Sequence, residues 1–246
     1  MKTGNRWPSQ LARFAFFAAI VFALQLYSLR EFVGLTADGK YPQMKIGIFG
    51  GSFDPVHYGH LIMAEQCREY AALDQVWFVP TAKQPLKPDG PQSGNKQRLE
   101  MLKLATAGHS GFRVSSVEID RGDVSYTIDT LKEIKQQRPH DDLFLVLGAD
   151  SLAKFNQWKE PDEICNLAIP LVVRRPGTNV SFETMNQFMN NARFEMAAKC
   201  QIESPLIEIS STQLRKSISE GRSVRYQLPR AVEKFIETNK LYASNQ

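Results

Sequence analysis

The chain has 246 residues, of which 43% are hydrophobic and 23% are charged. This composition excludes a disordered chain, a collagen-like repeat and a small disulfide-stapled domain. Residues 1–43 hold five of the 30 Lys and Arg residues and two of the 26 Asp and Glu residues, which leaves 25 against 24 in residues 44–246. That nearly neutral body gives no electrostatic reason to expect a nucleic-acid partner. Three scattered cysteines predict no disulfide framework and a reducing, cytoplasmic location: Cys67, Cys165 and Cys200.

The first 43 residues differ in kind from the rest of the chain. Basic residues precede the apolar run Phe14–Leu24, which is short for a transmembrane helix and more typical of a signal sequence or a buried helix. Three interpretations stay open: a false start with Met44 as the true first residue, a membrane tether, and export with a poor cleavage site. We expect residues 44–246 to form the functional domain, residues 1–43 to be an extension, and a membrane to be a partner only if that extension is a tether.

From Met44 onward, short β-rich segments alternate with longer amphipathic ones. The apolar pattern predicts strands at Lys45–Phe49, Gln75–Pro80, Arg113–Ile119, Leu143–Leu147, Ile169–Val173 and Leu206–Ile209. Helices are predicted at Leu61–Tyr70, Asn95–Ala107, Thr127–Gln137, Ser211–Glu220 and Leu228–Asn239, and a long loop at Lys83–Asn95. Apolar strands separated by helices are typical of a parallel sheet covered on both faces. The expected fold class is therefore α/β, a doubly wound, mostly parallel sheet with a small helical C-terminal part.

The turn after the first predicted strand carries the strongest functional signal, because ligands of parallel sheets bind beyond the carboxyl ends of the strands. Gly50 and Gly51 let the backbone approach a ligand closely, and the helix that follows offers free N–H groups and a positive dipole to an anion. His57 and His60 are three residues apart at the helix start, so both rings can reach one phosphate. The chain lacks a P-loop motif, and this turn lacks Gly-x-Gly-x-x-Gly. These absences exclude a P-loop protein and argue against a dehydrogenase.

Two distant segments resemble the motifs of one enzyme superfamily. The run Gly50-Gly51-Ser52-Phe53-Asp54-Pro55-Val56-His57-Tyr58-Gly59-His60 resembles the adenylyltransferases with the signature (T/H)xGH. Ile209-Ser210-Ser211-Thr212-Gln213-Leu214-Arg215, predicted to end a strand and begin a helix, is similar to their Ile-Ser-Ser-Thr-x-Ile/Leu-Arg motif. Its hydroxyls can cap the helix or bind phosphate, and Arg215 adds a forked donor suited to polyphosphate. From Met44 to Tyr242, the order of motifs most resembles bacterial nicotinate-nucleotide adenylyltransferases.

The resemblance implies a Rossmann-like enzyme of NAD biosynthesis that transfers AMP from ATP to nicotinate mononucleotide, giving nicotinate adenine dinucleotide and pyrophosphate. It implies His57 and His60 as catalytic residues, no covalent intermediate and no resident metal, with Mg²⁺ carried in by ATP. The residues it assigns to ATP are Gly50, Gly51, Ser52, Phe53, Gly148, Asp150, Ser211, Thr212 and Arg215. Those assigned to nicotinate mononucleotide are Lys83, Lys87, Tyr126, Thr127 and Trp158. The Tyr126-Thr127 turn would receive the carboxylate, and Trp158 would stack on the pyridine ring.

One departure from the family lies in the loop after the second predicted strand. The family commonly has Pro-Pro-His-Lys there, whereas this chain has Gln84-Pro85-Leu86-Lys87. Without the histidine, the ammonium group of Lys83 or Lys87 would have to neutralise more of the charge of a bound phosphate. The alternative is that both lysines are simply solvated loop residues.

Two other functions stay open. One is an adenylyltransferase of the same superfamily acting on nicotinamide mononucleotide or on phosphopantetheine, although Trp158 and the Tyr126-Thr127 turn argue against an acceptor without a ring. The other is a membrane-tethered, non-catalytic nucleotide-binding module, suggested only by residues 1–43. The sequence does not indicate which oligomeric state the chain adopts.

Overall fold

The computed structural model describes residues 42–85, 90–174, 182–205 and 207–244. The chain divides into two units, Met1–Gln43 and Met44–Gln246, and the second contains the fold described below. Nearly all of the hydrophobic extension, and with it the proposed tether, lies outside the described residues. Within the described ranges, no helix has both the length and the apolar character needed to cross a membrane.

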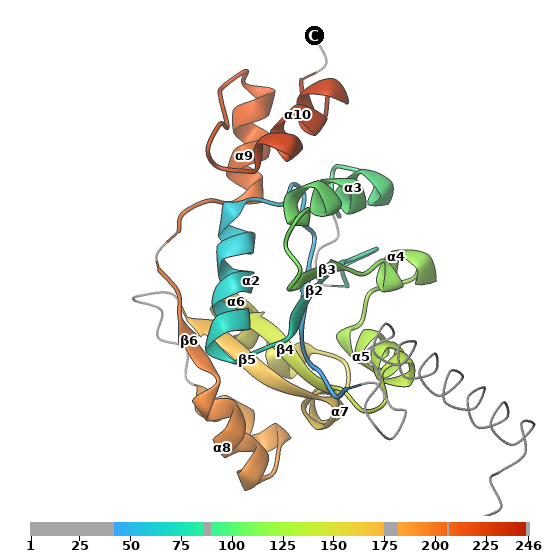
Figure 1. Ribbon diagram of the computed structural model, residues 1–246, viewed down its shortest axis with the longest axis vertical. Helices are drawn as coiled ribbons and strands as arrows, with labels where there is room; N and C mark the ends of the chain where they lie inside the picture. Colours follow the sequence, from blue (N-terminus) through green and yellow to red (C-terminus); the bar gives the residue numbers. More distant parts are fainter. Residues whose placement is uncertain (1–41, 86–89, 175–181, 206, 245–246) are drawn as a thin grey trace, which may run out of the picture. The chain divides into compact units, whose positions relative to one another are not determined.

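Six strands among the described residues form one sheet in the order β3-β2-β1-β4-β5-β6 (Figure 1). All neighbouring strands are parallel, which confirms the predicted α/β class. The strand order reverses between β1 and β4, and the crevice beyond the carboxyl ends of two such strands is where this type of sheet binds ligands. The strands are β1 (Lys45–Gly51), β2 (Gln75–Pro80), β3 (Phe112–Val114), β4 (Asp142–Gly148), β5 (Ala168–Arg174) and β6 (Gln201–Glu203).

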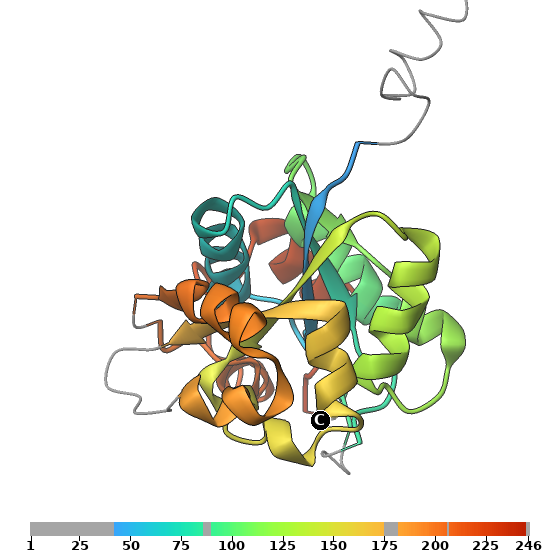
Figure 2. The same ribbon diagram turned by 90° about the horizontal axis from the view of Figure 1, so that it is seen from below.

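Helices cover both faces of the sheet and bury its central strands. The helix α2 (Tyr58–Tyr70) lies on one side and α5 (Thr127–Gln137) on the other (Figures 1 and 2). Leu143 to Leu147 of β4 are consequently all buried, as a continuous apolar strand requires. Close packing also needs Gly47 in β1, because a Cβ at this position would lie 2.7 Å from Cδ1 of Leu73.

The five predicted helices are present with small differences at their ends. They are α2, α3 (Asn95–Thr106), α5, α9 (Ser211–Ser219) and α10 (Arg230–Thr238). The elements that were not predicted are mostly short: α4 (Val117–Arg121), α6 (Ala149–Leu152), α7 (Pro161–Leu167), α8 (Asn191–Lys199) and the 3-10 segments Phe155–Gln157 and Phe182–Phe188. The small helical C-terminal part consists of α9 and α10, which lie beyond the start of α2 (Figure 1).

The predicted strand Arg113–Ile119 is wrong in its second half. The strand β3 ends at Val114, and residues from Val117 form α4. This turn of helix brings the carboxylate of Glu118 inward, where it accepts a hydrogen bond from Oγ1 of Thr130 at 2.7 Å. Gly122, with φ of 77°, then ends the helix in the left-handed conformation.

The predicted strand Leu206–Ile209 is misplaced. The sheet edge is formed earlier, by β6 (Gln201–Glu203), while residues 207–210 have no regular structure and Leu206 lies outside the described residues. Ile207 and Ile209 instead line a cavity, so their apolar side chains form part of its wall rather than a strand.

The three cysteines are free, and burial raises the pKa of the Cys67 thiol to about 12.

Candidate functional site

A cavity of about 710 Å³ lies beyond the carboxyl ends of β1 and β4. Its walls come from the β1–α2 loop (residues 52–57), the starts of α2, α6 and α9, and the segment that precedes α9. Both predicted catalytic histidines and all nine residues predicted to bind ATP line it. The fold thus brings residues near positions 50, 150 and 210 of the chain to one cavity.

The two histidines at the start of α2 stack on each other. The ring centres of His57 and His60 are 3.7 Å apart and their planes differ by 28°. Phe53 packs against His60 with ring centres 5.0 Å apart, nearly edge to face. The aromatic core therefore holds both imidazoles at the mouth of the β1–α2 turn, as their spacing predicted.

A backbone hydrogen bond fixes the protonation of His60. The amide N–H of His57 donates to Nδ1 of His60 at 3.3 Å, so Nδ1 acts as an acceptor and the neutral ring carries its proton on Nε2. Burial, together with the neighbouring His57, lowers the pKa of His60 well below its ordinary value. His60 is thus a neutral hydrogen-bond donor at neutral pH.

Two glycines lie in close contact with these rings. A Cβ at Gly59 would lie 3.0 Å from Nδ1 of His57, and a Cβ at Gly51 would lie 3.0 Å from Cζ of Phe53. Phe53 itself adopts φ of 47° and is only 1% exposed. Phe53, assigned to ATP from the sequence, therefore also serves as a packing support for His60.

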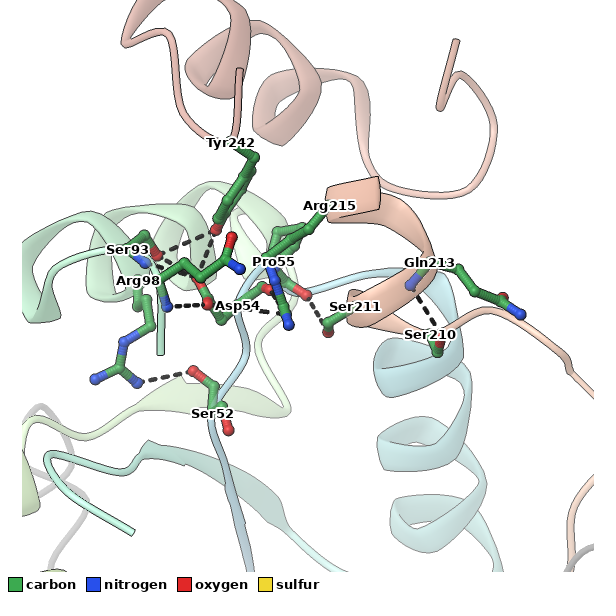
Figure 3. A network of polar contacts seen from close by, with 11 residues as sticks. Ser52, Asp54, Pro55, Ser93, Arg98, Ser210, Ser211, Gln213, Arg215 and Tyr242 are labelled. Carbon is green, nitrogen blue, oxygen red and sulfur yellow. Dashed lines mark hydrogen bonds and ion pairs between the residues drawn. The ribbon is translucent and has the colours of Figure 1, made fainter. Parts of the chain in front are cut away.

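Asp54 is a buried hub that the sequence interpretation did not single out (Figure 3). Its carboxylate, 1% exposed, accepts hydrogen bonds from the Gln92 amide at 2.7 Å, from the Ser93 amide at 3.2 Å and from the Ser93 hydroxyl. The phenol of Tyr242 donates to the same carboxylate at 2.6 Å. These donors fill the carboxylate's acceptor sites and fix the β1–α2 loop from behind.

The start of α9 docks directly onto the β1–α2 loop. Ser210 caps the helix by accepting from the amide of Gln213 at 3.3 Å, and the hydroxyl of Ser211 donates to the carbonyl of Pro55 at 2.9 Å. Nη1 of Arg215 donates to the carbonyl of Asp54 at 2.7 Å. Arg215 also lines the cavity, and its Nε is buried without a hydrogen-bond partner within the described part of the chain.

Arg98 supports the same region from α3. Its side chain is fully buried and donates to the carbonyls of Ser52 at 2.8 Å and of Thr81 at 2.6 Å, as well as to Oδ1 of Asn95 at 2.6 Å. The guanidinium thereby joins the loops that follow β1 and β2 (Figure 3 shows its bond to Ser52). Burial lowers the pKa of Arg98, and nearby Asp54 opposes that effect.

Those residues predicted for the nicotinate end that the structure describes do not line this cavity. Lys83 is held beside the start of α5, because its carbonyl accepts from the amide of Ser125 at 2.9 Å. Tyr126 and Thr127 begin that helix. Nζ of Lys159, which was not predicted, lies 4.9 Å from the Tyr126 ring centre. Gln84, the residue that follows Lys83 in the chain, does line the cavity. Lys83 is therefore adjacent in sequence to a cavity residue.

Trp158 is half-buried and packs against Phe155 with ring centres 5.2 Å apart. Its neighbour Lys159 contacts Tyr126, which connects Trp158 to the same region. Lys87 and the position of the missing histidine, Leu86, lie outside the described residues.

Acidic ligands for a resident metal are scarce. Within the described ranges, no cluster of three or more His, Cys, Asp or Glu residues could hold a metal ion. Of the carboxylates that line the cavity, Asp54 is occupied by its hydrogen-bond donors and Asp150 is exposed at the start of α6. This donor set does not form a cage for a cation.

Comparisons with known proteins agree with this geometry. The profile of the cytidylyltransferase-like family matches residues 48–217. A protein of Rhodopirellula baltica named "Probable nicotinate-nucleotide adenylyltransferase" is 42% identical over 213 residues, covering 85% of this chain and 99% of its own length. A protein of the same name from Roseiflexus castenholzii is 43% identical over 198 residues, covering 80% and 98%.

Solved structures show the same fold. The nicotinic acid mononucleotide adenylyltransferase of Plasmodium falciparum, complexed with NaAD, superimposes with a TM-score of 0.64 at 18% identity, covering 81% of this chain and 98% of that chain. The same protein complexed with APC gives a TM-score of 0.62 at 17% identity. At this level of identity the likeness concerns the fold.

Proposed function

The chain belongs to the cytidylyltransferase-like family and, within it, to the nicotinate-nucleotide adenylyltransferases, and we infer that its cavity is where AMP passes from ATP to nicotinate mononucleotide. The products are nicotinate adenine dinucleotide and pyrophosphate, in a step of NAD biosynthesis. The observation that carries this assignment is the stacked pair His57 and His60, facing a cavity lined by all nine residues predicted for ATP.

The chemistry requires charge stabilisation rather than a general base. A phosphate monoester has its second pKa near ~6, so the attacking 5′-phosphate of the mononucleotide is largely dianionic at neutral pH. The enzyme must hold two polyanions in line and stabilise the negative charge that develops on the α-phosphate and on the leaving pyrophosphate. Hydrogen-bond donors and cations perform both tasks, and no covalent intermediate is needed.

The residues of the cavity match that requirement. We assign His57 and His60 to the oxygens of the α-phosphate and the leaving group, with His60 donating from Nε2. Arg215 and the first turn of α9, with Ser211 and Thr212, also line the cavity and suit the β- and γ-phosphates. Asp150, exposed at the start of α6, suits the hydroxyls of the adenosine ribose.

Mg²⁺ belongs to the substrate in this proposal. Among the described residues that line the cavity, Asp150 is the one exposed carboxylate, which fits a cation carried by the ATP phosphates better than a resident metal. Bound to those phosphates, the ion would neutralise part of their charge. We also propose a cytoplasmic location, because free cysteines, two of them buried, suit a reducing compartment.

The nicotinate end is assigned to the group around the start of α5. The helix start at Tyr126-Thr127 suits a carboxylate. Lys159, whose Nζ lies beside the Tyr126 ring and 3.3 Å from both carboxylate oxygens of Asp129, adds a positive charge to this region. Trp158, half-buried at one side of this group, offers a flat surface for the pyridine ring. Lys83, whose carbonyl accepts from the Ser125 amide, is assigned to the mononucleotide phosphate.

The test of the phosphate site is His60→Ala in the full chain. Loss of one donor to a developing charge costs about 10²–10³ in rate, so kcat should fall by that factor while the affinity for ATP changes little. Release of pyrophosphate from ATP and nicotinate mononucleotide gives kcat, and calorimetric titration with an ATP analogue gives affinity. His140→Ala, which changes an exposed histidine outside the cavity, is the matched control and should be fully active. A nearly normal kcat in His60→Ala would refute the assignment.

A second assay separates the possible acceptors. With nicotinate mononucleotide, nicotinamide mononucleotide and phosphopantetheine offered at equal concentration, we expect the highest kcat/KM for nicotinate mononucleotide. Lys159→Ala should then reduce kcat/KM for the acid more than for the amide, because the ammonium group of Lys159, although paired with Asp129 at 3.3 Å, attracts the carboxylate of the acid and not the neutral amide. An equal reduction of kcat/KM for the acid and for the amide in Lys159→Ala would contradict the assignment of Lys159.

A further inference from the structure

The segment after α10 returns to the β1–α2 loop, although it lies far away in the sequence. Tyr242 is 188 residues from Asp54, yet its hydroxyl donates to Oδ1 of Asp54 at 2.6 Å (Figure 3). The same hydroxyl is 3.1 Å from Oγ of Ser93, which itself donates to Asp54. None of the sequence motifs includes Tyr242, and it does not line the cavity.

Asp54 transmits this contact to a phosphate-binding side chain. The carboxylate of Asp54 is held by the loop before α3 and by Tyr242, while the carbonyl of the same residue accepts from Nη1 of Arg215. Nη1 of Arg215 is also 3.9 Å from Oδ2 of Asp54. Because Nη1 of Arg215 is bound to Asp54, a shift of Asp54 would also move the guanidinium of Arg215 relative to the cavity.

We propose that Tyr242 is a positioning residue, which holds Asp54 and thereby aims Arg215 at the polyphosphate of ATP. The proposal rests on the function proposed above for the cavity. Tyr242 suits this task because its ring is rigid and its hydroxyl is the donor that comes to Asp54 from the C-terminal segment. Burial and the neighbouring Asp54 raise the pKa of Tyr242, so the phenol keeps its proton throughout the working pH range.

Other contacts keep the C-terminal segment in place when the hydroxyl is removed. Oγ of Ser244 donates to the carbonyl of Ser219 at 2.8 Å, and the amide of Leu241 donates to the carbonyl of Ile236 at 3.0 Å. Tyr242→Phe leaves these bonds and the packing of the ring unchanged. The substitution therefore tests the hydrogen bond to Asp54 and not the attachment of the segment.

The experiment compares Tyr242→Phe with Tyr226→Phe in the full chain. Tyr226 lies in the same C-terminal part, also at positive φ, but is 85% exposed. Loss of one hydrogen bond to a buried charge should reduce kcat/KM for ATP about tenfold in Tyr242→Phe, with KM for nicotinate mononucleotide unchanged. Tyr226→Phe should keep both parameters. A lower Tm in Tyr242→Phe with unchanged ATP kinetics would reduce Tyr242 to a structural role and overturn the proposal.

A double-mutant cycle checks that the effect passes through Asp54. Ser93→Ala should reduce kcat/KM for ATP in the same direction, and Tyr242→Phe combined with Ser93→Ala should be less impaired than the product of the two single effects. Strictly multiplicative effects would indicate independent sites and overturn the proposal.

Binding without turnover separates this proposal from the proposed function. A titration of the protein with α,β-methylene-ATP and Mg²⁺ needs no acceptor. Tyr242→Phe should raise the Kd of this analogue about tenfold. If the unaltered chain binds the analogue but releases no pyrophosphate with nicotinate mononucleotide, the proposed reaction fails while the weaker binding of Tyr242→Phe still supports the positioning role. An unchanged Kd overturns that role.

Discussion

The chemistry of His60 depends on its neighbours more than on its own identity. The amide of His57 occupies Nδ1, the ring of His57 stacks on one face, and Phe53 packs against the ring edge-on. Gly59 leaves room for this arrangement, because a Cβ there would press on His57. The HxGH spacing therefore specifies a donor with a fixed tautomer, ready to meet an anion without reorganisation.

The lowered pKa of His60 predicts how stability responds to acid. In the unfolded chain the pKa of His60 is the ordinary histidine value of about 6.5. In the folded protein, burial and the neighbouring His57 lower this pKa well below that value. Below pH 6.5 the unfolded state therefore binds more protons than the folded state, and the free energy of unfolding falls as the pH falls. In His60→Gln, the decrease in the urea midpoint between pH 7.5 and 5 should be shallower than in the unaltered chain.

The control for this pH series is His140→Gln, which changes an exposed histidine and should reproduce the pH dependence of the unaltered chain. The same urea titrations, followed by circular dichroism at each pH, provide the comparison. Parallel curves for His60→Gln and His140→Gln would show that the pKa of His60 is not lowered in the folded state.

Arg98 determines how one element, α3, is joined to the sheet. Its guanidinium is fully buried and donates to the carbonyls of Ser52 and Thr81, which follow β1 and β2, and to Oδ1 of Asn95, so three acceptors depend on one side chain. A lysine has a single ammonium group and cannot span these acceptors with a planar fork. We expect Arg98→Lys to lower the free energy of unfolding by about 3 kcal/mol, because buried acceptors lose their donors.

Urea unfolding measures this change, and Arg113→Lys is the matched control. Arg113 is exposed and lies over the Trp77 ring at 4.3 Å, so its replacement should cost about 0.5 kcal/mol or less. Equal effects of the two substitutions would mean that the three bonds of Arg98 contribute little to stability.

Elements with strong periodic patterns were predicted well, and the exceptions have physical causes. The strand Gln75–Pro80 and the helix Thr127–Gln137 have the predicted bounds, since each buries a continuous or periodic apolar face. The helix α4 has only five residues and is decided by the tertiary contact of Glu118 with Thr130. Local patterns contain no information about such a contact.

The cavity shows the same division between local and long-range information. His57, His60 and Arg215 stand in contiguous motifs, so a sequence that carries the motifs predicts the residues. Tyr242 meets Asp54 across 188 positions. A single sequence cannot indicate such a pair, because only the packing of α9 and α10 beside the β1–α2 loop brings the two residues together.

At the scale of the whole molecule, one compact unit holds everything that the proposed reaction uses. The residues that line the cavity run from Phe49 to Arg215, and the supporting side chains extend to Tyr242. The family match, residues 48–217, lies entirely in the same unit, Met44–Gln246. The parallel sheet supplies the rigid frame, and the start of α9 with the segment before it completes one wall of the cavity.

This completeness predicts that a chain shortened to Met44–Gln246 keeps the activity. We expect its kcat and its KM for ATP to stay within about twofold of those of the full chain, because no described residue of the cavity or its support is removed. Pyrophosphate release by the two purified chains provides the measurement, and circular dichroism verifies that both are folded. A loss of more than tenfold in kcat in a folded, shortened chain would show that residues 1–43 take part in the reaction, and would turn the extension from an appendage into part of the enzyme.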